Sequence, residues 1–344
     1  MFASGGRFHF LGWKDGVMSV KAVGLFSGGL DSQLAARVLQ LQGVEVELLH
    51  CITDPERFEG ARVEEGASRL GAPLRALDVS EEFFEVVRSP RFGYGSGMNP
   101  CLDCRILMLR KAKALMEEAG ARFVFTGEVL GQRPMSQHRG ALRLVERESG
   151  LDGLLLRPLS AKLLPPTTPE LEGWVDREGL YDFSGRSRKP QMALAKELGI
   201  SEYPSPAGGC WLTDRTFSAR LRDLFGHGGC FTREQAVLLR VGRHFRLSEG
   251  VKTIVGRNRD ENALLLEHRE GRWVVQVMDY PGPVVLVEGE PSEEDLLRAA
   301  SVAVRYSDGR DREDVRVRWE RDGEEGGAEG VCPADEEELS RWRL

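Results

Sequence analysis

Lys21-Ala-Val-Gly-Leu-Phe-Ser-Gly-Gly-Leu-Asp-Ser32 is the stretch that decides the fold of this chain. Its first half is apolar and predicts a strand, and the residues after it, 33–42, have the pattern of a helix. Gly28 and Gly29 allow a tight turn between the two, so that backbone N–H groups and the positive end of the helix dipole face an anion. Ser27 and Ser32 add hydroxyl donors, and Asp31 adds a carboxylate that suits Mg²⁺. The stretch therefore predicts a site for a phosphate chain.

Short apolar runs and amphipathic helices alternate from this loop to about residue 200, which predicts an α/β, Rossmann-like domain with a parallel sheet. Such sheets bind ligands beyond the carboxyl ends of their strands, where the loop lies. The expected strands are 22–26, 44–51, 74–78 and 123–126, and the expected helices are 33–42, 58–70, 104–119 and 190–198.

The pattern of the sequence changes at the Pro- and Gly-rich segment 203–209. A helix around 233–239 and short strands at 252–255, 263–267, 273–277 and 284–287 predict a smaller α+β domain. A hairpin, an acidic Gly-Glu linker and a short helix at 335–343 follow. The expected domains are an N-terminal extension (1–20), a nucleotide domain (21–205), an α+β module (206–306) and a charged tail (307–344).

The 344-residue chain carries a net charge of −7, which argues against a generally basic coat for nucleic acid but allows local basic faces. No apolar run is as long as a membrane span, and the first residues do not resemble a signal peptide. We therefore expect a cytoplasmic protein without membrane contact, whose translation starts at Met1 or Met18. In that compartment clustered cysteines indicate metal or catalytic sites rather than disulfides.

Three of the six cysteines form a constellation. Cys101 and Cys104 lie one turn apart at the start of a helix, where a thiolate is favoured, and Cys210 follows a run of small residues far downstream. The three could hold a 4Fe-4S cluster with one iron open to a non-protein ligand. They could instead bind zinc with a histidine, although no histidine lies at a local spacing. In a third interpretation, Cys104 and Cys210 are a nucleophile and its resolving partner that carry a persulfide.

The loop resembles the Ser-Gly-Gly-x-Asp-Ser loop of the PP-loop ATP pyrophosphatases, which split ATP between its α and β phosphates. Three further segments resemble the tRNA 4-thiouridine synthetases, the ThiI group, in the order of that family. These segments are Cys104-Arg-Ile-Leu-Met-Leu-Arg110, Thr126-Gly-Glu-Val-Leu-Gly-Gln132 and Leu156-Arg-Pro-Leu159. The resemblance implies an ATP-dependent tRNA sulfurtransferase.

The chain also departs from that family. We find neither its ferredoxin-like and THUMP domains before the loop nor a rhodanese domain after the nucleotide domain. Instead, Gly250-Val-Lys-Thr-Ile-Val-Gly-Arg-Asn258 with Glu261-Asn262 resembles the RNA-binding module of NFACT proteins. This second resemblance implies an RNA-binding module at the C-terminal end.

The resemblance to the thiolases implies a reaction in two steps. ATP adenylates a uracil carbonyl oxygen, and sulfur from sulfide or from a cysteine desulfurase persulfide then replaces AMP. Sulfur would arrive on the open iron of the cluster, or as a persulfide on Cys104 or Cys210. The implied roles are as follows: Ser27, Gly28, Gly29, Asp31 and Ser32 hold the phosphates and Mg²⁺, the backbone around Cys51 meets adenine, Gly127 and Gln132 line the nucleotide pocket, and Cys101, Cys104 and Cys210 hold the cluster.

Several basic residues allow two interpretations. Arg186, Arg188 and Lys189 open a helix and suit either a phosphate contact or an exposed helix start. Lys252, Arg257 and Arg259 suit RNA contacts. Two rival functions remain at this point. The first is another PP-loop ligase or amidotransferase, and the three cysteines argue against it. The second is an RNA-binding protein with a regulatory ATP site, and the intact Asp31 and Ser32 argue against that.

Overall fold

The computed structural model describes residues 20–205 and 210–344, which form two compact units. Within the described chain, the first unit comprises residues 20–52, 59–78 and 105–205. The second comprises residues 53–58, 79–104 and 210–344. Two short segments of the N-terminal half are thus part of the second unit.

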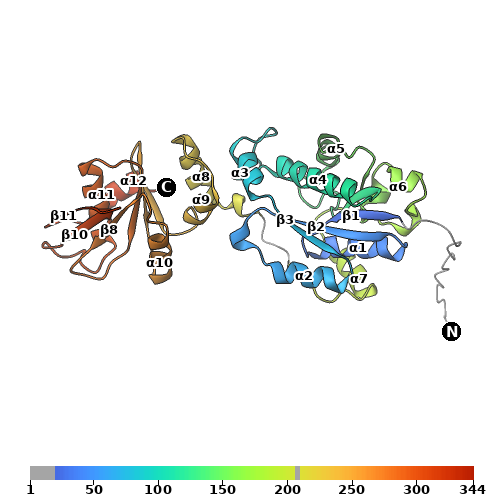
Figure 1. Cartoon of the computed structure of the whole chain (residues 1–344), viewed down its shortest axis with the longest axis horizontal. Coiled ribbons are helices and arrows are strands. Elements are labelled where there is room, and N and C mark those ends of the chain that lie inside the picture. Colours follow the sequence, from blue (N-terminus) through green and yellow to red (C-terminus); the bar gives the residue numbers. More distant parts are fainter. Residues whose placement is uncertain (1–19, 206–209) are drawn as a thin grey trace. The chain divides into compact units, whose positions relative to one another are not determined.

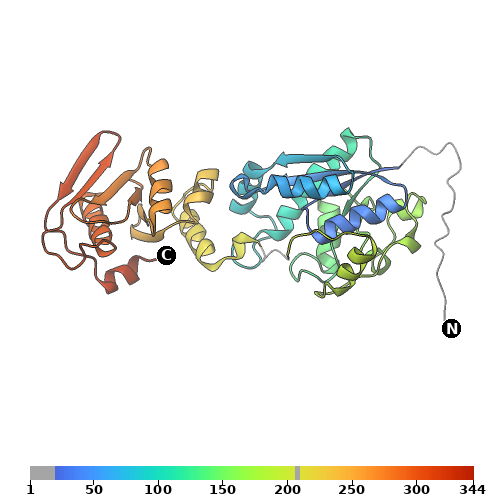
Figure 2. The ribbon, with the colours of Figure 1, turned by 90° about the horizontal axis from the view of Figure 1, so that it is seen from below.

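The first unit is a parallel sheet of five strands in the order β3-β2-β1-β4-β5, with helices on both faces. Helices α1 and α7 lie on one face, and α4 and α5 lie on the other (Figure 1), as the second view confirms (Figure 2). The α/β, Rossmann-like prediction is therefore confirmed. The elements are β1 (Lys21–Leu25), α1 (Leu30–Leu41), β2 (Glu45–Ile52), α2 (Gly60–Arg69), β3 (Leu74–Asp78), α4 (Cys101–Glu118), β4 (Phe123–Thr126), α5 (Arg139–Glu148), β5 (Leu155–Leu156), α6 (Thr168–Leu171) and α7 (Lys189–Glu197).

Strand β1 is the central strand of the sheet, and the phosphate loop follows its carboxyl end. It pairs with β2 from Lys21↔Glu45 onward and with β4 from Ala22↔Phe123 onward. The chain leaves β1 toward β2 on one side and reaches β4 on the other, so the strand order reverses at β1. Ligands of open α/β sheets bind at such a reversal. The loop that follows Leu25 lies there.

The second unit contains a six-stranded sheet in the order β11-β10-β8-β9-β7-β6, paired antiparallel throughout. One of its hydrophobic clusters joins the sheet to α11 and α12, and another joins it to α9 and α10. The elements are α3 (Ser80–Arg88), α8 (Arg215–Gly226), α9 (Arg233–Leu238), β6 (Arg243–Ser248), β7 (Val251–Val255), α10 (Arg259–Glu267), β8 (Trp273–Val277), β9 (Val285–Glu288), α11 (Glu293–Arg305), β10 (Val317–Arg321), β11 (Glu324–Ala328) and α12 (Glu336–Trp342).

Two expectations about the C-terminal half are wrong. Residues 263–267 are helical rather than extended, because Asn258 accepts a hydrogen bond from the Glu261 N–H and caps α10. The stretch expected as an acidic Gly-Glu linker is β11, which pairs with β10 in the same sheet. Among residues 20–205 and 210–344, no helix is both long and apolar enough to cross a membrane.

Candidate functional site

The phosphate loop is stabilised by its own side chains. Gly28 has a φ of +71°, a conformation that favours glycine, and Gly29 is the N-cap of α1. The Ser32 hydroxyl donates to the Gly29 carbonyl over 2.9 Å, and the buried Gln33 amide donates to the Gly28 carbonyl over 2.9 Å. Sequence reasoning missed Gln33, which follows the recognisable motif. The carbonyls of Gly28 and Gly29 thus accept hydrogen bonds from side chains of α1. The backbone N–H groups at the start of α1 are left to bind an anion.

Asp31 carries one oxygen that is bonded and one that is not. Its Oδ2 accepts a hydrogen bond of 3.0 Å from the Gln132 amide, whereas Oδ1 is buried and has no hydrogen-bond partner in the described structure. Burial raises the pKa of Asp31, although the Gln132 bond and the charges of Arg188 and Arg133 act in the opposite direction. A carboxylate oxygen of this kind suits Mg²⁺, so the residue fits the predicted ion.

A pairing between distant loops joins the segment before Arg188 to the segment that follows β4. Leu130 and Ser184 form a parallel bridge, and the Gly185 N–H donates to the Leu130 carbonyl over 2.7 Å. Leu130, which makes this pairing, and Gln132, which binds Asp31, both belong to the segment that follows β4. The Nε of Arg188 is buried and has no hydrogen-bond partner in the described structure. Sequence reasoning missed Arg133, whose only signal is its place after Gln132.

Gly127 lies against the start of α1. A Cβ at Gly127 would come within 2.5 Å of the backbone carbonyl of Asp31 and 2.6 Å of the Ser32 nitrogen. Only glycine permits this approach, because real Cβ contacts are never that short. The structure therefore brings Gly127 and Gln132 to the phosphate loop, and their role in a nucleotide pocket stays a prediction.

Glu128, the next residue, brings together the three segments that resemble the thiolases. It is 2% exposed and lies 3.2 Å from Nε of Arg157, in the Leu-Arg-Pro-Leu segment, and 3.1 Å from Nε of Arg105, which follows Cys104. Arg157 also contacts Glu146 over 2.9 Å. Burial alone would raise the pKa of Glu128, but the two arginines and the bonds from Arg157 and Thr126 hold it below its usual value. Glu128 is therefore a buried structural anion.

The end of β2, where adenine is expected, contains His50 and Cys51. The Nδ1 of His50 lies 2.8 Å from the Phe26 carbonyl, and burial lowers the pKa of the ring. Cys51 pairs in register with Leu77 of β3 and is half-buried. The position agrees with the expected strand end, and the contact with adenine stays a prediction.

Cys101, Cys104 and Cys210 all belong to the second unit and are half-buried. Their segments are joined by a hydrogen bond of 2.9 Å from the Met98 N–H to the Leu212 carbonyl. Within residues 20–205 and 210–344, however, no three Cys, His, Asp or Glu side chains are grouped so that they could hold a metal ion. The described side chains thus show no preformed metal site at the three thiols, and the small residues 206–209 before Cys210 lie outside the described chain.

The residues expected to contact RNA differ in their surroundings. Lys252 is 2% exposed and its Nζ lies 2.7 Å from Glu288, so its expected RNA contact is wrong. Arg257 is held by Glu261 through side-chain and backbone hydrogen bonds. Arg259 is exposed at the start of α10. Arg257 and Arg259 are thus both exposed, whereas Lys252 is buried.

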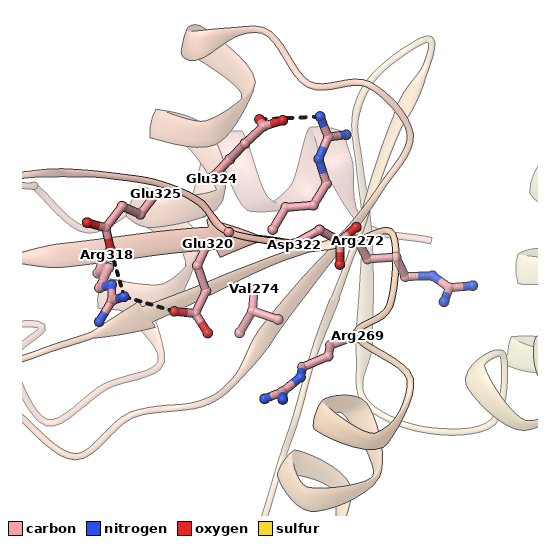
Figure 3. A pocket seen from close by; sticks show the side chains of 10 residues that line it. Arg269, Arg272, Val274, Arg318, Glu320, Asp322, Glu324 and Glu325 are labelled. Atoms are coloured by element: carbon pink, nitrogen blue, oxygen red, sulfur yellow. Dashed lines mark hydrogen bonds and ion pairs between the residues drawn. The ribbon is translucent and has the colours of Figure 1, made fainter.

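A cavity of about 280 Å³ opens between β10, β11 and the loop before β8. Arg318 pairs there with Glu320 and Glu325, and Arg269 makes no ion pair with the residues drawn (Figure 3). The other ion pairs of arginines in this unit include Arg246–Asp223, Arg272–Glu234, Arg316–Asp279 and Arg321–Glu290. Most of the arginines named in this paragraph thus have a carboxylate neighbour that offsets their positive charge.

The loop after β1, the parallel sheet and the contacts of Glu128 with Arg105 and Arg157 all lie within the first unit. Residues 17–162 match the family model described as "Thiamine biosynthesis protein (ThiI)", and residues 242–343 match the one described as "NFACT protein RNA binding domain". Both resemblances found in the sequence are thereby confirmed.

Three curated relatives each match about half of this chain. A tRNA sulfurtransferase of Desulfurococcus amylolyticus is 31% identical over 49% of this chain and 34% of its own length. A probable tRNA sulfurtransferase of Methanothermobacter thermautotrophicus is 27% identical over 48% of this chain and 41% of its own. The tRNA-specific 2-thiouridylase MnmA of Xanthobacter autotrophicus is 30% identical over 55% of this chain and 49% of its own. The chain thus spans between a third and a half of the length of these relatives.

Proposed function

We propose that the protein is an ATP-dependent tRNA sulfurtransferase that adenylates a uracil carbonyl oxygen and replaces that oxygen with sulfur. The observation that carries this proposal is the strand-loop-helix of residues 21–32, with its inward-bonded carbonyls and the unpartnered Oδ1 of Asp31. The names of the curated relatives support the tRNA substrate and the sulfur chemistry.

In the first step, the uracil oxygen attacks the α phosphorus of ATP and pyrophosphate leaves. The N–H groups at the start of α1 would bind the phosphate chain, and Asp31 would hold Mg²⁺, which neutralises phosphate charge. Arg188 and Arg133 are close enough to act on the charge of Asp31, so we assign them to the departing pyrophosphate. Gln132 fixes the orientation of Asp31 through its 3.0 Å bond.

In the second step, sulfur forms a bond to the activated uracil carbon and AMP leaves with the former carbonyl oxygen. We propose Cys101, Cys104 and Cys210 as the residues that handle this sulfur. A 4Fe-4S cluster on the three thiols would supply an iron with a free coordination position. Because the described thiols are not grouped for a metal, a persulfide on Cys104 or Cys210 is the second candidate. Its outer sulfur would bond to the uracil carbon, and the other thiol would then attack the inner sulfur, so that the S–S bond to the uridine breaks and a Cys104–Cys210 disulfide forms.

Mass spectrometry of tRNA from cells with and without the gene tests the proposal, with loss of a thiolated uridine as the expected result. With purified protein, Asp31→Asn should lower tRNA-dependent AMP formation about 100-fold, whereas Asn at the exposed Asp182 should leave it unchanged. Unchanged tRNA in the deletion strain would contradict the function. Cys→Ala variants at the three positions that bind as much iron as wild type after anaerobic reconstitution would exclude the cluster and leave the persulfide.

A further inference from the structure

A loop before Cys101 docks on the segment that follows Cys210. The Met98 N–H donates to the Leu212 carbonyl over 2.9 Å, and the Ser218 hydroxyl donates to the same carbonyl over 2.9 Å. The guanidinium of Arg222, on α8, donates to the Gly97 carbonyl over 3.1 Å. All of these residues lie within the second unit, so its own packing brings the two cysteine-bearing segments together.

Gly97 is the closest point of this contact. A Cβ at Gly97 would lie 2.5 Å from both the Leu212 carbonyl oxygen and the Ser218 hydroxyl, and 3.1 Å from the Cα of Thr213. Two of these atoms are backbone and cannot turn away. The φ of Gly97 is +67°, which also disfavours any residue with a Cβ. The docked arrangement therefore requires glycine at this position.

We propose that Gly97 is a positioning residue that holds the Cys210 segment against the turn containing Cys101 and Cys104. Gly97 lies four residues before Cys101, and Leu212 lies two residues after Cys210, so a shift at this contact moves the thiols relative to one another. The proposal deepens the sulfur chemistry proposed above and rests on it for its functional meaning. It requires no bound metal, because the contact consists only of protein atoms.

The test uses the full chain with Cys51, Cys230 and Cys332 each replaced by Ser, and a short bis-maleimide as the probe. Mass spectrometry after digestion measures the cross-link between Cys210 and either Cys101 or Cys104. Gly97→Ala should lower its rate about tenfold. Single alkylation of each cysteine by a monofunctional maleimide should stay within about twofold of the parent, since the thiols keep their exposure.

Gly93→Ala is the matched control. Gly93 lies in the same loop with a φ of +73°, but nothing lies within 4 Å of its added Cβ, so this variant carries the same backbone strain without the clash. Arg222→Ala, which removes one hydrogen bond and no packing at Gly97, should give an intermediate loss and serves if Gly97→Ala does not fold.

The proposal is overturned if Gly97→Ala cross-links as fast as the parent, or if Gly93→Ala slows the reaction equally. Full thiolation activity in a Gly97→Ala protein that has lost the cross-link would also overturn it. If the cross-link behaves as expected while the wild-type protein thiolates no tRNA, the docking holds and the proposed function fails instead.

Discussion

At the scale of single residues, the most consequential charge is the buried carboxylate of Glu128. It faces Arg105 and Arg157, and Arg157 is itself only 4% exposed. A buried ion pair adds little compared with a well-packed apolar core, but removal of one partner leaves an uncompensated charge. The Gly-Glu segment is thus a structural support as well as a neighbour of the phosphate loop.

Glu128→Gln should destabilise the first unit by about 3–5 kcal/mol, because two arginines then lose their anion. Urea unfolding monitored by circular dichroism measures this loss. Glu65→Gln, which removes an exposed partner of Arg69, should change the free energy of unfolding by less than about 0.5 kcal/mol. Equal stability of the two variants would contradict the structural role of Glu128.

His244 makes the second unit sensitive to acid. Burial lowers its pKa well below the ordinary 6.5, and the positive charges of Arg220 and Lys252 act in the same direction. The unfolded chain therefore binds a proton that the folded chain does not. This contribution to stability is complete above pH 6.5 and is lost as the pH falls below that value.

Urea midpoints measured between about pH 5 and pH 7.5 should fall steadily below the ordinary histidine pKa. His244→Gln should flatten that decline, even if it lowers the midpoint at every pH. A decline of the same steepness in the variant would show that another group titrates.

The sequence could predict the strand, the turn and the start of the helix in residues 21–32, because its glycines and hydroxyls are adjacent, and phosphate binding there stays a prediction. It could not predict the partners of Glu128, since an ion pair between residues 29 positions apart leaves no periodic pattern. The unpartnered Oδ1 of Asp31 and the contribution of Arg133 also depend on tertiary packing.

At the scale of elements, apolar runs identified four of the five parallel strands and missed the two-residue β5. They also gave a wrong prediction where a local cap starts a helix. Residues 263–267 contain three consecutive leucines and resemble a strand, but the cap at Asn258 begins a helix. The glycines of β11 resemble a linker. They are needed because a Cβ at Gly326 would come within 2.5 Å of the Trp319 indole nitrogen.

The contact between the loop after β4 and the start of α1 gives a further prediction. Gly127→Ala should weaken ATP binding at least about tenfold, because the new Cβ displaces the backbone of Asp31. Calorimetric titration with ATP measures the effect. Gly226→Ala, at a site with nothing within 4 Å, is the control and should bind like wild type.

At the scale of the whole molecule, the second unit is assembled from segments that lie far apart in the chain. Phe84 of α3 packs edge-on against Phe231 at 4.8 Å between ring centroids, and Phe83 lies 6.4 Å from the ring of Trp211. Asp54, just after β2, pairs with Arg240, whose guanidinium lies 4.4 Å from the Trp211 ring. A cut at residue 206 would remove these partners.

A fragment of residues 210–344 should therefore leave its aromatic cluster partly exposed. We expect red-shifted fluorescence of Trp211 and binding of a hydrophobic dye, while a fragment of residues 242–344 keeps the strands of the antiparallel sheet. Native-like fluorescence in the longer fragment would show that residues 53–58 and 79–104 are dispensable for folding.

The paired arginines of the second unit have a consequence for how an RNA would be held there. Protein cations that lack partners displace the counterions condensed on a phosphate backbone, and the release of those ions makes binding weaken steeply with salt. Arg257, Arg318 and Arg321 already have carboxylate neighbours, so few counterions would be freed. If this unit binds RNA, its affinity should consequently change little with ionic strength. The binding would depend on shape and on base stacking more than on charge.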